Sequence, residues 1–326
     1  MQATSLAASA IACSRAVFAN PIPEYHWQQL AAMPYPMQEI YPALEGEKIH
    51  VVGGFSAQVS GVAATDRHIQ YNIGTNHWRD LAPLPEVRHH PQLVACRGAI
   101  YAFGGFKPDA SGDWVMKNQS WVYNIDKDRW SETKAAPELH AESVSMALED
   151  TVHIIGGRTP KGERNAAWQD HTDTTRHLLF DTRTAQWHQA APATHPRNSA
   201  AGAVIDGLIY VVGGRIANGG NLDILEVYDP SEDKWRAAAP MPQAQGGLAA
   251  AALNGELIAF GGEYFGASGF GVYAQAWRYE PGQDRWSAIA PMKTPRHGLG
   301  AVSDGTAVFA IGGSTEIATK GTSAVL

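Results

Sequence analysis

The chain has 326 residues, of which 44% are hydrophobic and 9% aromatic, which is enough apolar side chain for a packed core. Its formal net charge is −7 and it has no block of Lys or Arg, which argues against nucleic acid as the main partner, because phosphate binding needs a concentrated basic surface. No run of about eighteen apolar residues occurs, so no membrane span is predicted.

The N-terminal residues have the composition of a leader. Residues 1–19 hold small apolar side chains and no acidic one, and they end in Val17-Phe18-Ala19, which suits signal peptidase. The basic start of a secretory signal is missing, so we expect residues 1–22 to be a truncated export signal. A periplasmic or secreted location follows, with a cytoplasmic protein carrying a leader as the alternative. Residues 23–326 are predicted to form one domain.

Six copies of one pattern follow along the chain. In each copy an apolar strand ends in a diglycine pair, and the pairs recur at intervals of 48 to 57 residues. The pairs are Gly53-Gly54, Gly104-Gly105, Gly156-Gly157, Gly213-Gly214, Gly261-Gly262 and Gly312-Gly313. A repeat of about 50 residues with few helical patterns is typical of a β-propeller built from four-stranded blades.

Each copy has constant and variable parts. Ahead of each diglycine, two apolar strands meet at a tight turn such as Asp206-Gly207 or Asn254-Gly255, because these residues tolerate the positive φ of a type I′ turn. After the diglycine comes a stretch of variable length, as in a surface loop. An aromatic residue and, seven residues later, a tryptophan then predict two strands joined by a short turn. These pairs are Tyr71/Trp78, Tyr123/Trp130, Phe180/Trp187, Tyr228/Trp235 and Tyr279/Trp286.

This pattern resembles that of the Kelch repeat family over about residues 25 to 326, and the resemblance implies an all-β, six-bladed Kelch β-propeller. The sixth copy lacks its own aromatic residue and tryptophan, but the stretch from His26-Trp27 to Met33-Pro34 looks like a fourth strand. We therefore expect an N-terminal strand to join residues 321–326 and close the ring, which leaves no blade edge unpaired.

The connections between blades are predicted to carry the site. They share one face with the variable loops and surround the central channel, where ligands bind. Residues two apart in a strand point the same way, so the residues 17 and 15 positions before each second glycine should converge on the channel mouth. The candidates are Arg88, Arg197, Gln245 and Arg296 in the first set, Glu39, His90 and Glu142 in the second, and Asn198 and His297 between them.

The long loops are expected to extend this wall. The longest runs from Arg158 to Thr175, and the loop of the fifth copy runs from Glu263 to Gln275. An aromatic ring beside carboxylates and arginines suits a sugar, because the ring packs on the C–H face and the polar groups bind the hydroxyls. The loop candidates are Trp168, Asp170 and His171, with Tyr264, Phe265 and Tyr273 from the fifth copy.

Three functions are consistent with this cavity. Among six-bladed Kelch proteins the chain is similar to the bacterial periplasmic sialic acid mutarotases, a likeness that implies interconversion of the anomers of an acidic sugar. An arginine would then bind the substrate carboxylate, and Glu142 and Glu39, with His90 as alternate, would be the general acid and base. A second reading is a non-catalytic module that binds a glycan or a protein, since Kelch domains also bind acidic peptides on this face. A metal-dependent enzyme is the third, although no recognised metal-ligand spacing occurs.

Our expectation is therefore a monomer that binds a small sugar or glycan with no cofactor and no metal ion. A protein partner belongs to the second reading. The ligand itself is not encoded in any motif of the sequence.

Overall fold

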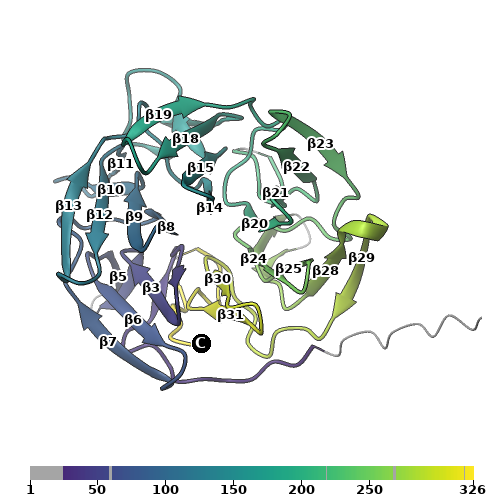
Figure 1. Cartoon of the computed structure of the whole chain (residues 1–326). Helices are drawn as coiled ribbons and strands as arrows, with labels where there is room; N and C mark the ends of the chain where they lie inside the picture. The colour runs from purple at the N-terminus through teal and green to yellow at the C-terminus, as the bar shows by residue number, and fades with distance from the viewer. Residues whose placement is uncertain (1–24, 59–60, 218, 267–268, 319) are drawn as a thin grey trace, which may run out of the picture.

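The computed structural model describes residues 25–326 except 59–60, 218, 267–268 and 319, so the predicted leader 1–22 lies outside the described residues. Five four-stranded antiparallel sheets and one two-stranded sheet surround a common centre (Figure 1). From the centre outward the sheets are β2 (Ala43–Glu45), β3 (Lys48–Val52), β6 (His68–Asn72) and β7 (His77–Leu81); β8 (Gln92–Cys96), β9 (Ala99–Phe103), β12 (Ser120–Asn124) and β13 (Arg129–Thr133); β14 (Val144–Leu148), β15 (Thr151–Ile155), β18 (His177–Asp181) and β19 (Gln186–Gln189); β20 (Ala201–Ile205), β21 (Leu208–Val212), β22 (Leu225–Asp229) and β23 (Lys234–Ala238); β24 (Ala249–Leu253), β25 (Glu256–Phe260), β28 (Ala276–Glu280) and β29 (Arg285–Ile289); and β30 (Gly300–Ser303) with β31 (Val308–Ile311).

In four copies the loop between the second and third strands forms a smaller sheet, which in the first copy also includes β1 of the preceding link. These are β1 (Met37–Gln38) with β4 (Phe55–Gln58) and β5 (Gly61–Ala64); β10 (Phe106–Pro108) with β11 (Trp114–Met116); β16 (Arg158–Pro160) with β17 (His171–Asp173); and β26 (Glu263–Gly266) with β27 (Gly269–Val272). Two short 3₁₀ turns, Trp168–Asp170 and Pro281–Gln283, complete the regular structure. None of the described residues forms a helix long and apolar enough to cross a membrane.

The predicted pairing of each aromatic residue with its tryptophan is confirmed. The two residues lie directly opposite each other on the third and fourth strands, as at Tyr228 and Trp235, whose ring centroids are 5.1 Å apart. The indole N–H of Trp235 donates to the carbonyl of Ala191 in the preceding blade at 2.8 Å. A fixed sequence spacing therefore sets the register within one blade and also joins that blade to its neighbour.

The diglycine pairs let neighbouring blades approach closely. All twelve glycines have positive φ. The backbone N–H of the second glycine in each pair donates to a backbone carbonyl of the link that leads into the next blade. At Gly54 this hydrogen bond reaches the carbonyl of Arg88 at 2.8 Å. A Cβ at Gly54 would come within 2.6 Å of the carbonyl oxygen of Gln38, so both the backbone conformation and the available space require glycine.

The seam between the sixth and first units is built from both ends of the described chain. The backbone N–H groups of Leu30 and Met33 donate to the carbonyls of Leu326 and Ala324, and the indole of Trp27 donates to the carbonyl of Ala290 at 2.7 Å. The N-terminal segment passes outside β31, between β29 and β7 (Figure 1). The structure assigns no strand to residues 26–33, so ring closure by an N-terminal strand stays a prediction.

Candidate functional site

The links between blades meet at the centre through residues in the left-handed conformation. The residue 15 positions before each second glycine has φ between 49° and 67° in all six copies. These residues are Glu39, His90, Glu142, Ser199, Gly247 and Gly298. Backbone hydrogen bonds of 2.7 to 3.3 Å join five of the six neighbouring pairs of these residues, for example the N–H of Gly298 and the carbonyl of Gly247.

A cavity of about 370 Å³ opens above this inner circle, which we call the channel-mouth cavity. It is lined by link residues and by the loops that follow the diglycines. The lining residues are Glu39, Phe55, His90, Trp114, Glu142, Trp168, Asn198, Arg215, Ile216, Ala217, Gly219, Glu263, Phe265 and Ala318. Six of the predicted candidates are thus brought together: Glu39, His90, Glu142, Asn198, Trp168 and Phe265.

Glu39 and His90 form an ion pair on the cavity wall. Their Oε2 and Nε2 atoms are 2.9 Å apart, and the His90 side chain is almost fully buried. Burial raises the pKa of Glu39, but the charge and hydrogen bond of His90 outweigh it, so this pKa falls to about 2. Burial lowers the pKa of His90, but the Glu39 carboxylate opposes it more strongly, so this pKa lies above its usual 6.5. The pair therefore favours the protonated form of His90 and the ionised form of Glu39.

Arg215 joins the remaining polar groups of the cavity into one network. Its guanidinium is paired with Glu263 and donates to the Oδ1 of Asn198 at 3.3 Å and the Oγ of Ser199 at 3.2 Å. The Ser199 hydroxyl in turn lies 2.7 Å from Oε2 of Glu142 and donates to it. These contacts fix the direction of the Glu142 carboxylate without neutralising it by a direct ion pair.

The three arginines predicted to line the channel mouth lie elsewhere, so the prediction that Arg88, Arg197 and Arg296 surround this cavity is wrong. Arg197 is buried between blades, paired with Glu226 and bonded to the carbonyls of Gly213 and Ile224. Arg296 donates to the carbonyls of Gly312, Val325 and Ala310.

The other two residues of this register have the same kind of role. Arg88 is fully buried over the ring of Trp121 and pairs with Glu86 at 3.1 Å. Gln245 donates to the carbonyl of Gly261, the first glycine of its own unit. Arg197, Gln245 and Arg296 therefore each tie their link to the first glycine of their own diglycine, and none of the four lines the cavity.

The correction has a local physical cause. The rule that residues two apart point the same way holds for an extended strand. Here the residue 15 positions before the glycine is left-handed, so the backbone turns between the two positions and sends their side chains in different directions. The residue 15 positions before the glycine faces the cavity, and the residue 17 positions before it faces the interior between blades.

Three further candidates lie behind the lining. His297 is fully buried, with Nδ1 3.4 Å from Glu263 and Nε2 2.8 Å from the carbonyl oxygen of Glu316. Asp170 accepts the N–H groups of Ala166 and Ala167 and so holds the turn that carries Trp168. His171 contacts Asn165 at 3.2 Å, so it supports the loop and is absent from the cavity lining.

Sequence reasoning missed Arg215 and Glu263, the residues directly after the second glycine in the fourth and fifth copies. In each copy this position pairs with the middle residue of a link, as Arg215 does with Asn198 and Glu263 with Gly246. When the copies are aligned on their diglycines, both residues stand directly after the second glycine, so inspection of that position would have found them.

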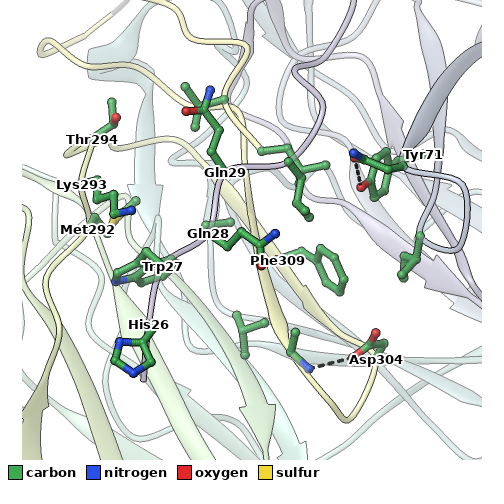
Figure 2. Close-up of a pocket in the computed structure, with 18 of the residues that line it drawn as sticks. His26, Trp27, Gln28, Gln29, Tyr71, Met292, Lys293, Thr294, Asp304 and Phe309 are labelled. Carbon is green, nitrogen blue, oxygen red and sulfur yellow. Dashed lines mark hydrogen bonds between the residues drawn. The ribbon is translucent and has the colours of Figure 1, made fainter. Parts of the chain in front are cut away.

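A larger cavity of about 440 Å³ lies at the seam between the sixth and first units. Figure 2 shows Trp27, Gln28 and Gln29 of the N-terminal segment facing Phe309 of β31 across it. We place the candidate site at the smaller cavity because that one gathers Glu39, His90, Glu142 and the Arg215–Glu263 pair. Among the residues that the structure describes, no group of three or more His, Cys, Asp or Glu side chains is arranged to hold a metal ion.

Known proteins resemble the chain in repeat and in fold. The Kelch motif matches residues 196–242. Kelch-like protein terF of Aspergillus terreus (strain NIH 2624 / FGSC A1156) is 28% identical over 189 residues, which are 57% of this chain and 40% of that protein. Beta-scruin of Limulus polyphemus is 24% identical over 226 residues, 67% of this chain and 24% of that protein. The chain thus matches less than half the length of these curated relatives.

Among solved structures, that of YjhT superposes with a TM-score of 0.77 at 18% sequence identity. The superposition covers 90% of this chain and 94% of that one, so the likeness extends over the whole fold. Together with the six diglycine units and the four-stranded sheets, these similarities identify the chain as a protein with Kelch repeats.

Proposed function

We propose that this protein binds a small acidic sugar in the channel-mouth cavity and interconverts its anomers. The observation that carries the proposal is the buried Glu39–His90 ion pair facing the same cavity as Glu142. A volume of about 370 Å³ suits a ligand of monosaccharide size. The exposed ring of Trp168 on the rim offers a surface for the C–H face of a sugar.

Anomer exchange needs one proton acceptor and one proton donor on opposite sides of the anomeric carbon. In our proposal Glu142 accepts the proton of the anomeric hydroxyl, and the proton shared by His90 and Glu39 passes to the ring oxygen as the bond from that oxygen to the anomeric carbon breaks. The open-chain aldehyde or ketone rotates, the ring closes on the other face of the carbonyl, and both protons return. No oxidant or reductant is consumed.

The rate of anomer exchange, followed by NMR, tests this proposal directly. Glu142→Gln keeps the shape of the side chain and removes the acceptor, so we expect a loss of about 10²–10⁴ in rate, and a similar loss for His90→Gln. Glu132→Gln, on the exposed outer strand β13, is the matched control and should exchange at the wild-type rate. If wild-type protein leaves every acidic sugar tried at the uncatalysed rate, the enzyme proposal is wrong.

A non-catalytic binding module is the second candidate, and one observation favours it. Four large apolar side chains are exposed among the described residues, and three of them, Trp168, Ile216 and Phe265, line the channel-mouth cavity, while Phe270 lies on the same hairpin as Phe265. An apolar rim around a polar centre is typical of a surface that binds a partner or a glycan. A sugar or protein that raises the melting temperature without any anomer exchange would support this candidate.

A further inference from the structure

Arg158 is a buried cation whose charge is compensated by few contacts. It is the first residue of β16, follows the third diglycine directly, and is fully buried. Its guanidinium makes one hydrogen bond, from Nη2 to the carbonyl oxygen of Trp168 at 3.2 Å. Its Nε and Nη1 atoms are buried without a hydrogen-bond partner among the described residues. Burying a charge in this way is costly, because the hydration lost is not replaced.

The other buried arginines are each compensated. Arg88 pairs with Glu86, Arg197 with Glu226, and Arg278 with both Glu256 and Glu280. Arg296 has no carboxylate, but it donates to three backbone carbonyls of the last unit and one of its own link. Arg158 alone among these buried arginines combines a single hydrogen bond with no ion pair in the part of the chain that the structure describes.

The indole of Trp168 covers the Arg158 guanidinium. The guanidinium carbon lies 3.2 Å from the centroid of the ring, in a cation–π contact. Trp168 itself is 43% exposed and lines the channel-mouth cavity, so the side chain that covers the unpaired cation is also part of the cavity wall. The short 3₁₀ turn Trp168–Asp170 that carries this indole is capped by Asp170.

The charges of the channel-mouth cavity require another cation if the ligand is acidic. Among the described lining residues, three carboxylates, those of Glu39, Glu142 and Glu263, face two cationic groups, His90 and Arg215, which are already paired with Glu39 and Glu263. A ligand carboxylate entering this cavity would be repelled unless a further positive group received it. Arg158 is within electrostatic range of Glu142 and is not neutralised by it in a direct pair.

We propose that Arg158 is the residue that binds the carboxylate of the acidic sugar, and that Trp168 occupies the place of the ligand until it arrives. This inference rests on the proposed function and assigns its substrate class to one residue. When the ligand enters, the indole moves off the guanidinium, and the carboxylate accepts from the unpartnered Nη1 and from the second hydrogen of Nη2 as a bidentate acceptor. The planar guanidinium donor pair fits a carboxylate in a way that a lysine would not.

The test compares an acid with its uncharged form in the full-length protein labelled with 5-fluorotryptophan. N-acetylneuraminate, its methyl ester and acetate are titrated, and the ¹⁹F resonance of Trp168 is assigned with Trp168→Phe. We expect the wild type to bind the acid at least about tenfold more tightly than the ester, since a charged hydrogen-bonded pair is lost in the ester. Binding of the acid or of acetate should shift the Trp168 resonance.

Two variants separate a binding role from a structural one. Arg158→Gln should bind acid and ester equally, keep the ester affinity of the wild type, lose the response to acetate, and melt at the same or a higher temperature. Arg197→Gln is the matched control, since it removes a buried guanidinium that is paired with Glu226. It should melt at a lower temperature and keep the preference for the acid.

Each outcome decides a separate claim. Retention of the acid preference in Arg158→Gln, or a fall in its melting temperature as large as that of Arg197→Gln, overturns the role of Arg158. A response to acetate with no binding of any sugar keeps the anion site and overturns the carbohydrate function. No response of wild-type Trp168 to acetate or to the acid overturns the anion site itself.

Discussion

At the residue scale, much of the contact between blades depends on one repeated side-chain pair. The hydroxyl of Tyr228 donates to Oδ1 of Asp233 at 2.7 Å, and the same oxygen accepts the N–H of Ala191 from the preceding blade at 2.7 Å. The residue at this position is left-handed in the first five units, with φ near 50°. The third unit has Phe180 and Ala185 at these positions. It lacks both hydrogen bonds because neither side chain has a polar atom.

Because the third unit lacks this pair, the contribution of the pair to stability can be measured by adding it there as well as by removing it elsewhere. Asp233→Ala should destabilise the protein by about 1–3 kcal/mol, because it leaves a hydroxyl and a backbone N–H without their partner. The double change Phe180→Tyr with Ala185→Asp should raise stability, because it adds the missing acceptor in the conformation that Asp tolerates better than Ala. Urea unfolding measures both. Equal stability of Asp233→Ala and wild type would contradict the role given to this pair.

Two buried histidine pairs give the fold a dependence on pH. His50 and His68, and likewise His153 and His177, are joined at 2.8 Å between ring nitrogens. Burial lowers the pKa of His50 and His153 to about 4, and that of His68 and His177 to about 3. In the unfolded chain these groups titrate near 6.5, so between pH 6.5 and about 3 the unfolded state binds more protons than the folded state.

The melting temperature should therefore fall as the pH is lowered from about 6.5 to about 3. His177→Gln keeps a hydrogen-bonding side chain beside His153 and removes one titrating group, so its melting temperature should fall less over this range. His188→Gln, on the outer strand β19, is the control and should follow the wild type. A wild-type melting temperature that is constant from pH 7 to pH 4 would show that these histidines are not buried in their neutral form.

At the scale of the element, the diglycine turn explains why a blade cannot shift against its neighbour. Gly54 and Gly207 have similar φ, 80° and 77°, but their surroundings differ. A Cβ at Gly54 would come within 2.6 Å of the Gln38 carbonyl oxygen and of Ile40, whereas one at Gly207 would meet nothing within 4 Å. Gly54 is required both for its positive φ and for the close contact between elements, whereas Gly207 is required for its positive φ alone.

Alanine at these two positions separates the two effects. Gly207→Ala should cost about 1 kcal/mol, the usual penalty of a left-handed non-glycine residue. Gly54→Ala carries the same conformational penalty together with displacement of the link at Gln38, so its loss of stability should be clearly larger. Denaturant unfolding of both variants provides the comparison. Equal losses would mean that the link moves away at no cost.

At the scale of the whole molecule, the two chain ends share one seam. Residues 25–37 supply Trp27 and the backbone donors to Leu326, Ala324 and Ser323, and the carbonyl of Ala31 accepts the indole N–H of Trp78 in the first blade at 2.9 Å. We predict that deletion of residues 1–34 prevents stable folding and that deletion of residues 1–22 does not. A cooperative thermal transition in the longer deletion would contradict closure of the ring by the N-terminal segment.

The sequence by itself determined the architecture of this protein. The period of the diglycines, the seven-residue spacing of each aromatic–tryptophan pair and the turns such as Asp206-Gly207 specify strands and register, because a hairpin pairs residues that are close in the chain. The placement of Glu39, His90 and Glu142 at one cavity also followed from their common offset to the glycines.

The tertiary structure alone decided which link residues face a ligand. The left-handed turn at Glu142 and its equivalents depends on hydrogen bonds between links of different blades, and no local pattern shows it. It sends Arg197 and Arg296 into the interior and leaves the cationic side of the cavity to Arg215 and to the covered Arg158. The direction of a side chain at a blade junction is set by contacts distant in sequence, whereas the pairing of strands is set by neighbours.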